Sequence, residues 1–230
     1  MDRIKTNIPG LDALIQGGIP ENDLIILSGT CGTGKTVFSL EYLYFSKEPS
    51  IYVTFEDQPS ELRSQALGFG WDLKKLEDRG ILKILKYDPF KIEDVFGMIE
   101  NNIREIKAKY VVIDSVSAFA IYMRDETEVR RTLLQVYDIL KKNKCTSILI
   151  SEIQPGTHKI SRFGVEEFVC DGVIVLRKIL QDNEYKRAIN VWKMKGTNHS
   201  RKFHMYEINN KGFFVYPNKV IDFRNVHFFT

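Results

Sequence analysis

The sequence predicts one α/β domain: a mainly parallel β-sheet flanked by helices, with an antiparallel extension at its carboxyl-terminal end. Over roughly the first 150 residues, short apolar segments alternate with amphipathic ones. The apolar segments lack the alternation of a strand with one wet face, which indicates strands covered on both sides. After Gly172 the apolar segments follow one another with only polar turns between them. No linker rich in Pro, Gly or Ser divides the 230 residues, so we expect a single domain over 1–230, with its core at about 4–216 and a short tail at 217–230.

The elements follow from these patterns in chain order. Buried strands are predicted at 24–28, 51–55, 81–85, 110–113 and 147–150. Helices are predicted from 35 to about 45, at 59–67, at 92–106 and at 126–142. Antiparallel strands are predicted at 173–180, 187–194, 203–208 and 212–216, with turns at 181–184 and 210–212. Strands separated by helices are typical of a parallel sheet with helices on both faces.

A glycine-rich loop lies between the first predicted strand and the first predicted helix. Its eight residues match the pattern GxxxxGK[ST]: Gly29, Thr30, Cys31, Gly32, Thr33, Gly34, Lys35 and Thr36. In this pattern the glycines let backbone N–H groups point at phosphate oxygens, the lysine reaches the β- and γ-phosphates, and the hydroxyl ligates Mg²⁺. A chance match in a glycine-rich turn is the alternative, but the flanking strand and helix favour a nucleotide site for ATP.

Carboxylates end two of the other predicted strands. Asp114 follows the strand at 110–113, where a Mg²⁺-coordinating acid is expected beside Thr36. Glu56 and Asp57 follow the strand at 51–55, at the sheet edge where ligands of parallel sheets bind. One of them could deprotonate a water in line with the γ-phosphate. The alternative interpretations are a capping residue and a solvated acidic turn.

Composition limits the function classes. Hydrophobic residues are 43% and charged residues 27% of the chain, which excludes extended disorder and fibrous repeats. No apolar run approaches the roughly 18–20 residues of a membrane span, and the amino terminus lacks the apolar core of a signal peptide, so we expect a cytoplasmic protein with no membrane contact. The formal net charge is +3, yet residues 186–202 hold six basic residues and no acid, which leaves −3 for the rest of the chain.

Taken together, the motifs resemble the RecA/RadA superfamily of ATPases, and within it the single-domain archaeal KaiC-like ATPases. The resemblance covers residues 4–216. It rests on Ile8-Pro-Gly-Leu-Asp12, Gly17-Gly-Ile-Pro20, the phosphate loop, Val53-Thr-Phe-Glu-Asp57, Gly68-Phe-Gly-Trp-Asp72, Val112-Ile-Asp-Ser115, Gly164-Val-Glu-Glu-Phe168, Asp171-Gly-Val-Ile174 and Lys193-Met-Lys-Gly-Thr197-Asn-His199. It implies a RecA-like P-loop NTPase fold and a Mg²⁺-dependent ATPase that forms a hexameric ring, with ATP between subunits.

The resemblance also implies roles for single residues. Glu56 matches the general base, and Asp57 stands where most relatives have a second glutamate. The segment that would contact a neighbouring subunit's nucleotide comprises Lys193, Met194, Lys195, Thr197 and His199. Relatives usually carry arginine at the position of Lys195, and a lysine lacks the bidentate fork, so we expect slow turnover. Glu167-Phe168 stands where the autokinase repeat of the clock protein has a Ser/Thr pair, so autokinase activity is disfavoured.

Three interpretations of the basic segment stay open: a solvated strand edge, contact with a neighbour's triphosphate, and DNA binding. Lys193 and Lys195 share strand parity, which favours the second. The alternative function is therefore an ATP-dependent scaffold or DNA-binding regulator with negligible hydrolysis. We further expect Trp71 and residues 213–216 to pack in the core or an interface, residues 141–144 to form a solvated helix end, and residues 158–163 to form a pore-facing loop.

Overall fold

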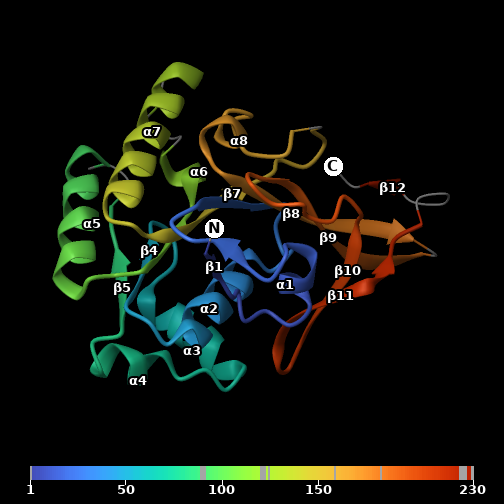
Figure 1. Cartoon of the computed structure of the whole chain (residues 1–230), viewed down its shortest axis with the longest axis horizontal. Coiled ribbons are helices and arrows are strands. Elements are labelled where there is room, and N and C mark those ends of the chain that lie inside the picture. The colour runs from blue at the N-terminus through green and yellow to red at the C-terminus, as the bar shows by residue number, and fades with distance from the viewer. Residues whose placement is uncertain are drawn as a thin grey trace.

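The computed structural model describes residues 2–88, 92–119, 123, 125–157, 159–181, 183–222 and 227–228. A single large β-sheet runs through the molecule, and helices cover both of its faces (Figure 1). Helices α1–α4 pack on one face and helices α5–α8 on the other, each layer burying its own apolar cluster. The predicted α/β fold class is confirmed.

The large sheet has the strand order β11-β10-β9-β8-β3-β7-β6-β4-β5, and β12 pairs with β8 off this path. Its strands are β3 (Leu24–Gly29), β4 (Ser50–Thr54), β5 (Leu82–Lys86), β6 (Tyr110–Asp114), β7 (Thr146–Glu152), β8 (Gly172–Gln181), β9 (Glu184–Met194), β10 (His204–Asn209), β11 (Gly212–Val220) and β12 (His227–Phe228). The strands from β8 to β5 along this order pair in parallel, while β8 to β11 pair antiparallel. Strand β8 therefore belongs to both parts, because it is parallel to β3 and antiparallel to β9.

The helices are α1 (Leu11–Leu14), α2 (Lys35–Ser46), α3 (Pro59–Gly68), α4 (Leu73–Asp78), α5 (Ile92–Ile106), α6 (Val116–Phe119), α7 (Glu126–Lys142) and α8 (Glu166–Val169). Their ends follow local rules. Pro59 opens α3 behind a capping box between Gln58 and Glu61, and the Asp125 carboxylate caps α7. A second, two-stranded sheet pairs β1 (Arg3–Ile4) with β2 (Ile19–Pro20).

The predicted helices and strands are present with small shifts of their ends. Seven short elements of the described residues were not predicted. Helices α1, α4, α6 and α8 have six residues or fewer and strands β1, β2 and β12 have two, too short for a period to show. Strand β11 continues to Val220, past the predicted end of the core at residue 216. Its partner β10 shows a register irregularity between His204 and Met205, so β11 can extend beyond a simple hairpin.

The carboxyl-terminal strands brace the helix that follows the phosphate loop. The backbone N–H of Phe213 donates to Glu41 Oε2 on α2 at 2.6 Å, and the Phe213 ring meets Phe38 edge-on at 5.3 Å. Burial raises the pKa of Glu41 to about 7. Trp71 and Phe213 are both buried, which confirms the predicted packing role for these two residues, whereas Phe214 is exposed and Tyr216 half-buried. The antiparallel extension thus fixes α2, and with it the position of the loop.

Candidate nucleotide-binding site

The phosphate loop connects β3 to α2 at the carboxyl edge of the parallel strands. Gly32 and Gly34 have positive φ angles of 69° and 91°, which glycine adopts without the strain that a side chain would bring. Helix α2 begins at Lys35, so its amino-terminal N–H groups face the loop. The Lys35 ammonium lies within the loop and donates to the carbonyls of Gly29 and Thr30 at 3.0 Å each. Burial lowers the pKa of Lys35, although nearby carboxylates oppose this shift.

Two oxygen ligands for a cation meet beside the loop. The Thr36 hydroxyl at the start of α2 lies 3.5 Å from Asp114 Oδ2 at the end of β6. Oxygen ligands around an octahedral Mg²⁺ lie about 3 Å apart, so the pair fits this ion. Tyr52 donates to the same Asp114 oxygen at 2.5 Å. Burial raises the pKa of Asp114 to about 6, and the hydrogen bond from Tyr52 and the charge of Lys35 offset the shift only in part.

Further acids line a cavity of about 290 Å³ in front of the loop. Glu56 and Asp57 lie in the turn after β4, and Glu152 ends β7, where it is the register partner of Gly29. Glu152 Oε1 lies 4.0 Å from Lys35 Nζ. Burial raises the pKa of Glu56, and the charges of Glu152 and Asp57 add to the effect. The cavity thus brings together an exposed acid, a buried lysine and two oxygen atoms that could bind a metal ion.

The predicted trans segment lies at the opposite edge of the sheet. Strand β3 has six residues, so its two ends are about 16 Å apart. The loop follows the carboxyl end of β3, whereas Asp171 lies beside Leu24 at the amino end and accepts from its backbone N–H at 3.1 Å. Lys195 Nζ donates to Asp171 Oδ1 at 3.0 Å. A lysine at this edge cannot reach the phosphate loop of its own chain.

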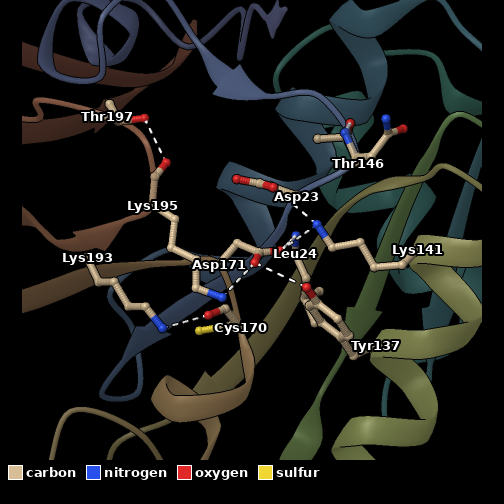
Figure 2. A network of polar contacts seen from close by, with 11 residues as sticks. Asp23, Leu24, Tyr137, Lys141, Thr146, Cys170, Asp171, Lys193, Lys195 and Thr197 are labelled. Atoms are coloured by element: carbon tan, nitrogen blue, oxygen red, sulfur yellow. Dashed lines mark hydrogen bonds and ion pairs between the residues drawn. The ribbon is translucent and has the colours of Figure 1, made fainter. Parts of the chain in front are cut away.

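Asp171 is the buried centre of an ionic network whose lysines are partly exposed (Figure 2). Its carboxylate is 5% exposed and pairs with Lys141 Nζ at 2.8 Å as well as with Lys195, while Lys141 also pairs with Asp23 at 3.2 Å. Tyr137 adds a hydroxyl donor at 3.3 Å. Burial alone would raise the pKa of Asp171, but the hydrogen bonds from Lys141 and Lys195 hold it below its ordinary value. The prediction of a solvated helix end was therefore wrong for Lys141, which closes this network.

The remaining residues of the segment lie nearby. Lys193 Nζ donates to the carbonyls of Glu167 and Cys170 at 2.7 Å each. The Lys193 ammonium therefore lies at the backbone of Cys170, next to the Asp171 carboxylate that binds Lys195 (Figure 2). Strand β9 ends at Met194, whose side chain is buried, and Lys195 lies just past the strand. Thr197 Oγ1 donates to the Lys195 carbonyl, and His199 Nδ1 lies 3.0 Å from the Ser200 carbonyl.

A larger cavity, of about 600 Å³, also opens at this edge. Arg104, Lys107 and Lys144 line it, close to the carboxyl ends of α5 and α7. Basic residues at helix carboxyl ends complement the helix dipole, and the carbonyl groups there disfavour a bound anion. The larger volume of this cavity is therefore no evidence that it binds the nucleotide.

Comparisons with known proteins agree with this arrangement. A family model described as "ATPase: KaiC" matches residues 4–220. The chain belongs to the KaiC family of ATPases. A UPF0273 protein of Pyrococcus furiosus is 38% identical, covering 95% of this chain and 96% of that protein, and a UPF0273 protein of Methanocaldococcus jannaschii is 38% identical, covering 97% and 100%. The circadian clock oscillator protein KaiC of Parathermosynechococcus lividus is 37% identical over 93% of this chain, which spans 42% of that longer protein.

A solved structure shares the KaiC-family fold. The crystal structure of a KaiC-like protein from Pyrococcus horikoshii superposes with a TM-score of 0.87, at 38% identity, and covers 94% of this chain and 99% of that one. The predicted family membership and the RecA-like fold class are thereby confirmed.

Four residues that line the cavity of this KaiC-family chain were not predicted as site residues: Val37, Thr54, Gln65 and Glu152. Glu152 lies two residues past the predicted strand at 147–150, and Gln65 reaches the cavity from α3. An acid just after an apolar strand was the signal for Glu56 and Asp114, and the same signal would have found Glu152. Nothing in the spacing of α3 points to Gln65. Of the predicted pore loop at 158–163, residue 158 lies outside the described residues.

The basic segment does not form one continuous stripe in this KaiC-family fold. Lys186 and Arg187 lie near the turn between β8 and β9, Lys193 and Lys195 lie at the opposite end of β9, and Arg201 and Lys202 lie in the loop before β10. No helix in the described part of the chain is both long and apolar enough to cross a bilayer.

Proposed function

We propose that the chain binds Mg·ATP at the phosphate loop and hydrolyses it to ADP and phosphate between neighbouring subunits of a six-membered ring. The observation that carries this proposal is the convergence of Lys35, Thr36, Asp114 and Glu56 around one cavity at the carboxyl edge of the sheet. Family membership supports nucleotide binding. Hydrolysis, the metal and the ring are inferred from the chemistry of these residues.

The phosphate loop would hold the β- and γ-phosphates through backbone N–H groups and the Lys35 ammonium. Thr36 and Asp114 would hold Mg²⁺, which when bound neutralises charge on the phosphate oxygens. The residues present fit this ion, because a hydroxyl and a carboxylate oxygen lie 3.5 Å apart and the carboxylate has no lysine or arginine bonded to it among the described residues.

Glu56 would act as the general base. A water in line with the γ-phosphorus attacks it, the Glu56 carboxylate accepts the proton, and the bond to the ADP oxygen breaks. The raised pKa of Glu56 brings it closer to neutral pH, where a carboxylate is a better proton acceptor. Glu152 faces the same space and is the second acid that such a test must include.

Lys193 and Lys195 would act on the nucleotide of a neighbouring subunit. Their position at the amino edge of the sheet, the end of β3 opposite to the loop, supports a trans role over a cis role. A ring places the amino edge of one chain against the carboxyl edge of the next, as heterologous contacts do.

A second candidate function is a nucleotide-dependent scaffold with very slow hydrolysis. It is favoured by the ion pair between Lys195 and Asp171, which already neutralises the lysine that would stabilise the transition state. The same candidate includes a DNA-binding regulator, for which the dispersed basic residues give less support than a continuous stripe would.

Phosphate release at saturating Mg·ATP tests the main proposal. We expect Lys35→Ala to lose nucleotide binding and Glu56→Gln to keep binding while phosphate release falls by at least about 100-fold. Glu152→Gln is the matched control at the same cavity. If Glu56→Gln releases phosphate at the wild-type rate and Glu152→Gln does not, the base assignment is wrong; if wild type binds ATP and assembles without hydrolysis, the scaffold is the better description.

A further inference from the structure

Strand β8 carries a lysine onto the phosphate loop of the same chain. A side-chain carbon placed at Gly32 would lie 2.6 Å from Lys178 Nζ and 3.4 Å from its Cε. The Lys178 ammonium therefore occupies the space beside Gly32, which is one of the residues lining the nucleotide cavity. This contact is a second reason for glycine at position 32, in addition to its positive φ of 69°.

The side of the sheet on which Lys178 lies follows from strand parity. Leu176, two residues earlier on β8, packs against Gly29 at the start of the loop, and residues two apart on a strand share a face. Lys186, by contrast, pairs with Ile179 and lies on the other face of the same hairpin. The hairpin thus presents one lysine to the loop and one away from it.

Neighbouring contacts hold the hairpin and the loop together. The buried Tyr206 hydroxyl on β10 donates to the Thr33 carbonyl at 2.6 Å, and the Ile208 side chain packs against Gly34. The carboxyl-terminal sheet therefore contacts the loop at several consecutive residues. This packing holds the strands of the carboxyl-terminal sheet against the loop. The position of Lys178 near the loop therefore does not depend on the conformation of its side chain alone.

The side chains that line the cavity carry an excess of negative charge, which favours a further cation beside it. Among the described residues that line it, four are carboxylates, Glu56, Asp57, Asp114 and Glu152, and one is a lysine, Lys35. A triphosphate adds further negative charge, which a bound Mg²⁺ offsets only in part. Among the described residues no carboxylate lies within 4.0 Å of the Lys178 ammonium, so its charge is not already neutralised there.

We propose that Lys178 is a phosphate-binding residue of the nucleotide site that acts in cis, binding the phosphate chain of the nucleoside di- or triphosphate held by its own phosphate loop. The inference rests on the proposed nucleotide function and extends it. Lys178 differs from Lys193 and Lys195, which lie at the other edge of the sheet. Its four-carbon stem lets the ammonium move from the Gly32 side of the loop onto a phosphate oxygen.

Equilibrium binding of a fluorescent ADP tests this proposal without requiring hydrolysis. Lys178→Met keeps most of the apolar stem but removes the charge, and we expect it to weaken ADP binding about tenfold, as loss of one charge-assisted hydrogen bond would. Lys178→Arg should restore most of the affinity. Lys186→Met, on the opposite face of the hairpin, is the matched control and should bind ADP like wild type.

The outcomes separate this proposal from the proposed function. Wild-type chain that binds neither ADP nor ATP contradicts the proposed function, and the inference fails with it. Wild-type binding together with an unchanged affinity in Lys178→Met overturns the inference alone. Equal losses in Lys178→Met and Lys186→Met also overturn it, because they would reflect damage to the hairpin and not a lost phosphate contact.

Mixed subunits test the cis placement. At subsaturating ATP, Lys178→Met mixed with Glu56→Gln should hydrolyse no faster than the weighted sum of the two variants. Each site would take Lys178 and Glu56 from one chain, so no mixed site regains both. A rate clearly above that sum would place Lys178 in trans and overturn the assignment.

Discussion

Two aspartates at opposite edges of the sheet have opposite environments. Asp114, at the carboxyl edge, accepts hydrogen bonds from the neutral hydroxyls of Tyr52 and Thr36, and burial raises its pKa to about 6. Asp171, at the amino edge, is bonded by Lys141 and Lys195, which hold its pKa below the ordinary value. The charge of Asp171 is neutralised by lysines of its own chain, as in a structural network. The charge of Asp114 is left for a bound ligand to neutralise, as in a binding site.

The largest expected effect is on stability at the amino edge. Asp171→Asn removes the charge that two lysines share. Because Lys141 and Lys195 are 30% and 53% exposed, we expect a cost of about 3 kcal/mol, the lower end of the range for breaking a buried ion pair. We expect the free energy of unfolding in urea to fall by about that amount. Lys195→Ala removes only the exposed partner and should cost about 1 kcal/mol or less. A loss below about 1 kcal/mol in Asp171→Asn would contradict a structural role for the network.

The same substitution at the carboxyl edge should have the opposite sign. The folded-state pKa of Asp114 is about 6 against an ordinary value of 3.8, so the folded chain binds more protons between these values and loses stability as pH rises through them. At pH 8 the charged Asp114 carboxylate therefore lowers the free energy of unfolding. We expect Asp114→Asn to raise the free energy of unfolding by up to about 3 kcal/mol while weakening Mg²⁺-dependent nucleotide binding. A clear fall in the free energy of unfolding of Asp114→Asn would contradict this, because it would show that other groups of the chain stabilise the charged carboxylate.

The smallest expected effect is a shift in the pH dependence of binding. Only the deprotonated Asp114 holds a cation well, so Mg²⁺-dependent ADP affinity should fall below pH 6 by up to about tenfold per pH unit. Tyr52→Phe removes a hydrogen bond that lowers this pKa, and should move the midpoint to higher pH. Tyr137→Phe is the control, because it removes a tyrosine hydroxyl that is bonded to Asp171 and not to Asp114. Titrations with and without Mg²⁺ measure both; an unmoved midpoint in Tyr52→Phe would remove Asp114 as the titrating group.

The carboxyl edge could be predicted from the sequence because its signals are local. The loop pattern occupies eight consecutive residues, and Glu56 and Asp114 each follow an apolar strand by one or two residues. The strand order was not needed to place them, since the carboxyl ends of parallel strands meet at one edge.

The amino edge and Lys178 depend on contacts distant in sequence. Asp23, Lys141 and Asp171 meet only because β3 lies beside β8 and α7 ends above them, so the basic end of α7 was interpreted as solvated. Lys178 reaches the loop because β8 is the parallel neighbour of β3, a pairing that periodicity does not reveal. Short-range patterns predict elements and motifs, whereas the pairing of strands decides which charges meet.

We propose that the carboxyl edge of one subunit and the amino edge of its neighbour together form one ATPase site. The most direct measurement is phosphate release from mixtures of Glu56→Gln and Lys195→Ala subunits. If Lys195 acts in trans, some mixed sites combine an intact Glu56 with an intact neighbouring Lys195, and activity should rise above the weighted sum of the two variants, with a maximum near equal proportions. No rise at any ratio, in mixtures shown to exchange subunits, would contradict the account.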